Sequence, residues 1–201
     1  MSPRRADPVL ADRRRDTLIR AGYAEILGTG IEAFTLDAVV ERAGSSKGGA
    51  LYYFRTKEDL LFAILQWLFS QLSRTLEEVE RSGESPRNRL AAGLEVLFHS
   101  ADVNRKLYLV LFDFVPLGTR SERFRGLFRE FQESCRKRDA AIIEEGIRQQ
   151  QFRRVRPDDA AATLRALVDG YCLQWLMGPE TVPIEKYRDL CRAVLGAYLL
   201  R

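Results

Sequence analysis

The chain has 201 residues, a formal net charge of +4 and 46% hydrophobic residues. This length suits one compact domain or two small ones, and the composition excludes a wholly disordered chain. No uncharged apolar run reaches about 18 residues, so we expect no membrane span. The N-terminal segment carries Arg without an apolar core and is unlike a secretory signal, which predicts a cytoplasmic protein.

Residues that commonly carry metal or nucleophilic chemistry are few and far apart. The histidine is His99, and the cysteines, Cys135, Cys172 and Cys191, include no close pair. Such spacing disfavours a zinc site, and a lone histidine disfavours a Ser or Cys triad. We therefore expect no metal, no cofactor and no enzymatic activity, and we expect the thiols to be reduced.

Apolar residues recur every three or four positions along almost the whole chain, which predicts an all-α fold of about nine helices. A first helix over residues 12–28 ends at the glycines of 28–30. Thr35 is placed to cap a short second helix, and Gly44 is placed to end it. After Ser45 and Ser46, a third helix runs to about residue 54.

The rest of the chain is also predicted to form helices separated by turns. Residues 57–59 open a long fourth helix, and the turns that follow contain Pro, Gly, Asn or Ser. Ser85-Pro86 and Arg156-Pro157 are typical helix starts. Five more helices are expected, over residues 86–100, 104–115, 120–151, 157–177 and 184–200.

Residues 30–54 have the pattern of a helix-turn-helix unit, with two short helices joined by the tight turn at Ala43-Gly44-Ser45. The second of these helices places Gly48 and Gly49 in its first turn, where each costs up to about 1 kcal/mol of helix stability relative to Ala. Glycines let a helix end approach another surface closely, and its free N–H groups suit phosphate. These features favour contact with DNA over a purely structural role.

The segment from Arg13 to Leu65 resembles the TetR family of bacterial transcription regulators. The resemblance rests on AGSSKGG at 43–49, LYYF at 51–54 and KEDLL at 57–61, in order and without gaps. It implies a flexible arm over 1–12, a DNA-binding domain over 13–60 and a ligand-binding and dimerisation domain over 61–201. It implies a DNA-binding regulator of transcription, most simply a repressor, that acts as a homodimer on a near-palindromic double-stranded operator.

The resemblance also implies roles for particular residues. Those expected at DNA are Thr35, Ser46, Lys47, Gly48, Gly49, Tyr52, Tyr53 and Lys57. Those expected at the dimer interface, on the last two helices, are Leu164, Leu167, Val168, Tyr171, Leu190, Val194, Leu195 and Tyr198. The aromatic residues expected to line a pocket for a small apolar or aromatic effector are Phe62, Trp67, Phe98, Tyr108, Phe112, Phe128, Phe131 and Trp175. Effector binding would favour a dimer whose DNA-reading heads are wrongly spaced, so that DNA affinity falls.

Two alternatives remain open at this point. The protein could be a helical small-molecule binding protein without working DNA recognition, and the apolar stripes could all face the core of one chain. The Arg-rich stretch at 120–139 carries interspersed Glu and is interpreted as a solvated face rather than a membrane-binding helix. Further phosphate contacts are expected from the N-terminal arginines Arg4, Arg5, Arg13, Arg14 and Arg15.

Overall fold

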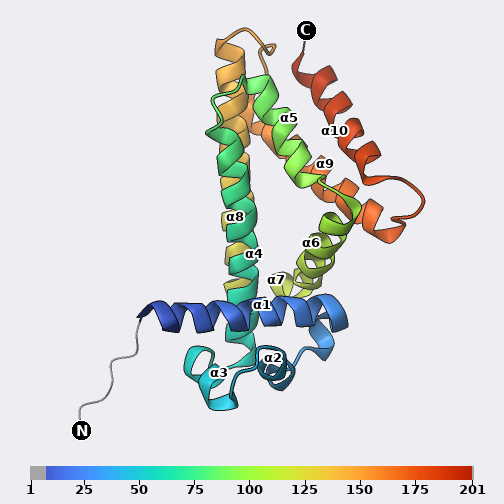
Figure 1. The fold of residues 1–201 in the computed structure, drawn as a ribbon. Helices are drawn as coiled ribbons and strands as arrows, with labels where there is room; N and C mark the ends of the chain where they lie inside the picture. Colours follow the sequence, from blue (N-terminus) through green and yellow to red (C-terminus); the bar gives the residue numbers. More distant parts are fainter. Residues whose placement is uncertain (1–7, 201) are drawn as a thin grey trace. The chain divides into compact units, whose positions relative to one another are not determined.

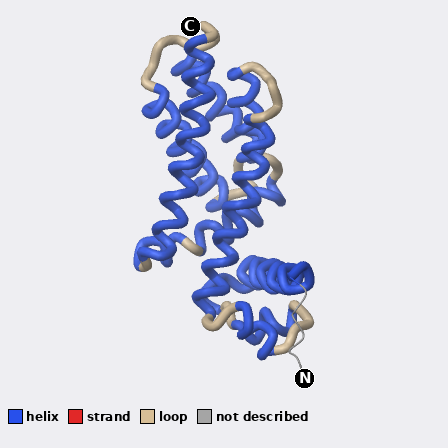
Figure 2. The backbone as a smooth tube through the Cα atoms, turned by 90° about the vertical axis from the view of Figure 1, so that its left-hand side faces the viewer, coloured by secondary structure: helices blue, strands red, loops and turns tan. Residues whose placement is uncertain are grey.

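The structure is a computed structural model, and it describes residues 8–200 as helices joined by short loops (Figure 2). No strand occurs within that range, so the predicted all-α class is confirmed. The helices, labelled in Figure 1, are α1 (Pro8–Ala33), α2 (Leu36–Arg42), α3 (Lys47–Tyr53), α4 (Lys57–Glu80), α5 (Pro86–Leu97), α6 (Ala101–Asp113), α7 (Val115–Arg120), α8 (Glu122–Arg148), α9 (Pro157–Met177) and α10 (Ile184–Leu199).

The N-terminal boundary differs from the prediction. Residues 8–12 belong to α1, so a helix begins inside the segment expected to be an arm, while residues 1–7, with Arg4 and Arg5, lie outside the described part. The predicted stop near residue 30 is seen as a break inside α1. Gly30 adopts φ 78° and ψ 165°, a conformation that glycine tolerates best, and three more helical residues follow it.

Other helix ends follow the expected chemistry. Pro86 and Pro157 each lie at the start of a helix, where a missing N–H removes no helical hydrogen bond. The segment at 115–120, which contains Pro116 and Gly118 and has the composition of a turn, instead forms the short helix α7. Gly118 has a packing role, because a Cβ there would lie 2.9 Å from the ring of Phe128.

The chain divides into two compact units. The first holds the described residues up to Leu68 together with Val110–Pro116, and the second holds Phe69–Leu109 with the described residues from Leu117 onward. Helices α4, α6 and α7 therefore each contribute to both units.

The first unit packs α1, α2, α3 and the start of α4 around a core that includes Leu18, Phe34, Val39, Ala50 and Ile64. A Cβ at position 22 would lie 2.5 Å from Ile64 Cδ1, so a larger residue there would force the Ile64 side chain to shift where α1 approaches α4. This packing holds the two short helices that could not persist alone.

The second unit is built on the long helices α8 and α9, with α5 and α10 against them (Figure 1). Its largest fully buried side chains are Phe98, Tyr108, Phe124 and Trp175. After α8 the chain turns through Gln150, at φ 59°, and folds Phe152 back onto Gly146.

Candidate nucleic-acid interface

The helix-turn-helix geometry predicted for residues 35–54 is present in the first unit. Thr35 is the N-cap of α2, and its Oγ1 accepts a hydrogen bond from Ala38 N at 3.2 Å. Gly44 adopts φ 59° in the turn that follows. Ser46 is the N-cap of α3, and its Oγ accepts from Gly49 N at 3.1 Å. Both predicted caps and the turn glycine are thus confirmed.

Two ion pairs fasten these short helices. Arg42 Nε on α2 lies 2.9 Å from Glu25 Oε2 on α1, and the Glu25 side chain is only 10% exposed. Lys47 Nζ on α3 lies 2.9 Å from Asp37 Oδ1 on α2, and both of these side chains are well exposed. The first pair is the stronger restraint because its carboxylate is shielded from water.

Four of the eight residues predicted to contact DNA are exposed on α3 or at its N-cap. Ser46, Lys47, Gly48 and Tyr52 are exposed, and Tyr52, at 75%, is unusually so for an aromatic residue. Tyr53 is half-buried and packs edge-to-face on Tyr52, with ring centroids 5.0 Å apart. An exposed aromatic side chain on a short helix gains little from folding, so its placement favours contact with a partner.

Gly48 is not required by the packing of the chain itself. A Cβ built at this position meets no atom within 4 Å, and its backbone is not in the left-handed region. At Gly49, by contrast, a Cβ would lie 3.0 Å from Ser46 Oγ, the cap of the same helix. Gly49 therefore protects the cap, whereas Gly48 keeps bare backbone at the surface.

An open hollow of about 490 Å³ lies beside α3. It brings together Ser46, Gly49, Tyr52 and Tyr53, four of the predicted residues. Arg14 and Thr17 of α1 also line it. Thr17 was not found from sequence because a single threonine inside a helix carries no recognisable signal. The hollow is lined by Arg14, Thr17, Leu18, Ala43, Gly44, Ser45, Ser46, Gly49, Tyr52 and Tyr53.

Lys57, the last residue predicted at DNA, opens α4 and is held by the chain. Its Nζ donates to Ile31 O at 3.4 Å and lies 5.5 Å from the centroid of the Phe34 ring. The N–H of Ile31 in turn donates to Asp113 Oδ2 at 3.1 Å, across 82 residues of sequence. Asp113 and Lys57 together fix the backbone just after the break in α1, and no local pattern pointed to Asp113.

The eight aromatic residues predicted to line an effector pocket are distributed over both units. Phe62, Trp67 and Phe112 belong to the first unit and are half-buried. Phe98, Tyr108 and Trp175 are almost fully buried in the second unit, where Phe128 and Phe131 are half-buried. Phe131 stacks on Phe69 with ring centroids 4.2 Å apart, and Phe128 meets Phe69 edge-on at 5.3 Å.

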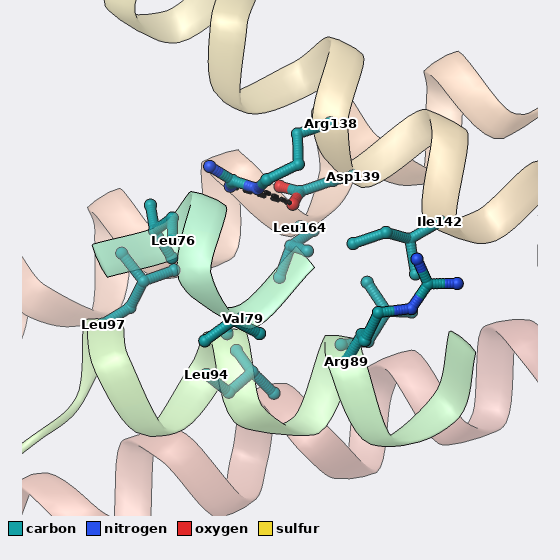
Figure 3. Close-up of a pocket in the computed structure, with 11 residues that line it drawn as sticks. Leu76, Val79, Arg89, Leu94, Leu97, Arg138, Asp139, Ile142 and Leu164 are labelled. Atoms are coloured by element: carbon teal, nitrogen blue, oxygen red, sulfur yellow. Dashed lines mark hydrogen bonds and ion pairs between the residues drawn. The ribbon is translucent and has the colours of Figure 1, made fainter. Parts of the chain in front are cut away.

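One small cavity of the second unit combines leucines with buried charge (Figure 3). Its volume of about 10 Å³ is space for one water molecule. Arg138 and Asp139 form an ion pair of 2.9 Å on one side, and Arg89, whose guanidinium pairs with Glu145, lines another part. Burial raises the pKa of Asp139, and the Arg138 guanidinium opposes that rise.

This cavity and a larger groove between α5 and α10 contain none of the eight predicted aromatic residues. The indole Nε1 of Trp175 is buried and has no hydrogen-bond partner in the described part of the chain. A buried donor without an acceptor is costly, which makes this nitrogen a candidate contact for a bound molecule.

Three of the residues predicted at a dimer interface are covered by the chain itself. Leu164, Val168 and Leu195 are at most 5% exposed, so they belong to the core of the second unit and are removed from the interface. The apolar stripes on α9 and α10 are wide enough to have two faces. Half-buried or exposed on these helices are Leu167, Tyr171, Leu173, Met177, Leu190, Val194 and Tyr198.

The cysteines are free and buried. Burial raises the pKa of Cys172 to about 12 and that of Cys191 to about 12, and it also raises the pKa of Cys135. Such thiols are poor nucleophiles at neutral pH. Among the described residues there is no group of His, Cys, Asp or Glu placed to hold a metal ion, and no helix that is long and apolar enough to span a membrane.

Comparison with known proteins assigns both parts of the chain. Residues 18–64 match the family described as bacterial regulatory proteins, tetR family, and residues 86–200 match the C-terminal domain of BetI-type transcriptional repressors. A curated relative is the HTH-type transcriptional regulator BetI 1 of Chromohalobacter salexigens, 25% identical over 94% of this chain and 91% of its own length.

Solved structures give the same result for the fold. A TetR transcription regulator from Haloarcula marismortui is 25% identical, with a TM-score of 0.86 over 94% of this chain and 99% of its own. A putative transcriptional regulator from Saccharomonospora viridis in complex with choline is 20% identical and has a TM-score of 0.86 over the same shares. The second likeness concerns the fold alone.

Proposed function

Since the chain belongs to the tetR family of bacterial regulatory proteins and is a transcriptional regulator, we propose that it is a repressor that releases its operator when a small apolar or aromatic effector binds. The observation that carries DNA binding is the capped helix α3, which exposes Lys47, Gly48 and Tyr52, with open space around Gly48. This is the geometry of a recognition helix that enters a major groove.

The eight residues predicted at DNA divide into two groups by their surroundings. Thr35, Ser46 and Gly48 keep backbone and small hydroxyl groups at the surface, which suits close approach to phosphate and base edges, and the half-buried Gly49 leaves room for the Ser46 cap. Lys47, Tyr52, Tyr53 and Lys57 would supply cations and phenol donors to the DNA backbone. Arg14, at the hollow beside α3, would add a further phosphate contact.

The active form is a homodimer in this proposal. The outward side of α9 and α10 carries Leu173, Met177 and Val194, which are 46%, 73% and 38% exposed. Exposed apolar residues on two neighbouring helices are typical of an interface between copies of a chain. A homodimer also supplies the two recognition helices that a near-palindromic operator needs. The interface would also take in Leu167, Tyr171, Leu190 and Tyr198.

The effector would bind in the second unit, in the cytoplasm where operator DNA is present. Trp175 offers a buried N–H that has no acceptor among residues 8–200, and the Phe69, Phe128 and Phe131 rings offer an apolar surface. The ligand acts by linkage, binding one dimer geometry better than another.

A gel-shift titration with the DNA upstream of the gene tests the proposal. Lys47→Ala and Lys57→Ala should each weaken DNA binding. Each should also make the plot of log affinity against log salt concentration less steep, by about 1 for every phosphate contact that is lost. Arg105→Ala is the control, since Arg105 is equally cationic and exposed but lies on α6 in the second unit.

The competing function is a helical small-molecule binding protein without working DNA recognition. It predicts no binding of any genomic fragment in a selection experiment, together with ligand-induced thermal stabilisation. Binding that is unaffected by both lysine substitutions would also refute the proposed interface.

A further inference from the structure

A groove of about 170 Å³ lies between α5 and α10, which pack side by side in the second unit (Figure 1). Its walls are preformed, because Leu90, Leu94, Leu195 and Leu199 are each at most 7% exposed. An apolar cavity of about 150 Å³ is large enough to bind benzene. The groove is lined by Arg87, Leu90, Ala91, Leu94, Phe152, Arg192, Leu195, Gly196, Leu199 and Leu200.

The charge of this lining has one sign. Its charged members are Arg87 and Arg192, and none of the ten lining residues is acidic. Arg192 is engaged outside the lining, with Nη2 at 2.6 Å from Glu95 Oε1 and Nη1 at 3.3 Å from Asp189 Oδ1. The exposed guanidinium of Arg87 forms no hydrogen bond or ion pair with any described residue. Arg87 is thus a cation available beside an apolar groove.

We propose that this groove binds an aliphatic monocarboxylate, with its chain between α5 and α10 and its carboxylate on Arg87. Guanidinium groups recognise carboxylates through paired hydrogen bonds, and leucine walls suit an alkyl chain. A cation of the same shape would have no acidic partner in the lining and would lie beside the unpaired Arg87 guanidinium. The site is distinct from the aromatic residues assigned to the effector, and the proposal does not depend on DNA binding.

Two side chains of the groove also face the small cavity of Figure 3. Leu90 and Leu94 also line the small cavity of Figure 3, so empty space lies on two sides of these side chains. The helix between the two spaces carries Ala91 and Gly93, which add little bulk. The space beyond the two leucines is about 10 Å³, room for one water molecule, so the groove itself sets the length of alkyl chain that fits.

Isothermal titration of the full chain with sodium octanoate, 1-octanol and octylammonium tests the assignment. Octanoate should bind best, octanol about five- to tenfold more weakly for lack of the charge-assisted hydrogen bonds, and octylammonium not measurably. Arg87→Gln should weaken octanoate about five- to tenfold and leave octanol unchanged. Arg105→Gln, which removes the same charge from an exposed site on α6, should change neither.

Ala91→Leu fills the groove from a half-buried helical position and should abolish binding of both octanoate and octanol. Its melting temperature verifies that the variant folds, and the exposed Arg87→Gln tests the site independently of that result. The proposal is overturned if octanoate does not bind, if octylammonium binds equally well, or if neither substitution weakens octanoate. It is also overturned if Ala91→Leu converts a dimer into a monomer, because the occupant would then be a second copy of the chain.

Discussion

Gly48 offers a test in which stability and DNA binding change in opposite directions. It lies in the first turn of α3, its backbone is ordinary, and a Cβ there meets no atom within 4 Å. Gly48→Ala should therefore stabilise the protein, because alanine loses less backbone entropy in a helix. The gain is about 0.5 kcal/mol near a helix end, or about 1–2 °C in melting temperature for a chain of this size.

The same methyl group should weaken DNA binding. If bare backbone at Gly48 lies against the duplex, a methyl group there separates the surfaces and costs about 1–2 kcal/mol per head, on the scale of a mismatched base pair. In a homodimer the cost is incurred twice, so operator affinity should fall by about 30-fold or more. Fluorescence anisotropy with a labelled operator measures this loss, and a thermal melt measures the stability.

Gly28→Ala is the matched control. Gly28 is exposed, lies within α1 and also has no atom within 4 Å of a built Cβ, so alanine should stabilise it by about 1 kcal/mol without changing DNA affinity. Gly49→Ala is unsuitable, because its Cβ crowds the Ser46 cap. Operator affinity for Gly48→Ala within twofold of the parent would refute the reasoning about α3.

Three further results are expected. Glu25→Gln breaks the shielded Arg42–Glu25 ion pair that fastens α2 to α1. It should therefore lower the free energy of unfolding by about 1 kcal/mol in a thermal melt and weaken operator binding. An unchanged melting temperature would contradict this. Val194→Arg places a charge in the proposed dimer interface and should reduce the mass measured by light scattering from about twice 23.0 kDa to 23.0 kDa. Ala141→Arg, at an exposed position of α8, should leave the mass unchanged. Burial raises the pKa of Cys172 and of Cys191 to about 12, so a thiol reagent at pH 8 should label neither cysteine before the protein unfolds. The free energy of unfolding should fall from about pH 9 towards pH 12, because the thiols of the unfolded chain ionise at a lower pH than those of the folded chain. Rapid labelling of the native protein would refute this.

The local geometry of the DNA-reading helices could be predicted from sequence because it depends on neighbouring residues. A threonine three positions before its N–H partner, a glycine at a positive φ and a serine ahead of a helix act within one turn, as Thr35, Gly44 and Ser46 do. Interactions between distant segments gave no such signal. The bond from Ile31 N–H to Asp113 joins residues 82 apart, and only the fold brings them together.

Burial on α9 and α10 illustrates the limit of periodicity. A stripe of apolar residues predicts that a helix face is covered, but it does not say whether the same chain or a second copy covers it. Leu164 and Val168 turn inward on α9, while Leu173 and Met177, which the sequence left unassigned, turn outward. The width of the apolar stripe was the available signal for a second covered face, because a helix that packs only against its own chain needs fewer apolar positions.

The cations expected at DNA are few, and the structure shows that the chain already engages two of them. Lys47 pairs with Asp37 on the surface, and Lys57 is bonded to Ile31 O. Exposed pairs of this kind contribute at most about 1 kcal/mol, so a phosphate can replace the internal partner at little cost. Since residues 1–60 hold ten basic and nine acidic side chains, bulk charge cannot supply the affinity. Recognition by this unit must therefore depend on how closely α3 fits the major groove. Gly48 has no packing role within the chain, but it matters for DNA affinity because it leaves no side chain between the α3 backbone and the duplex.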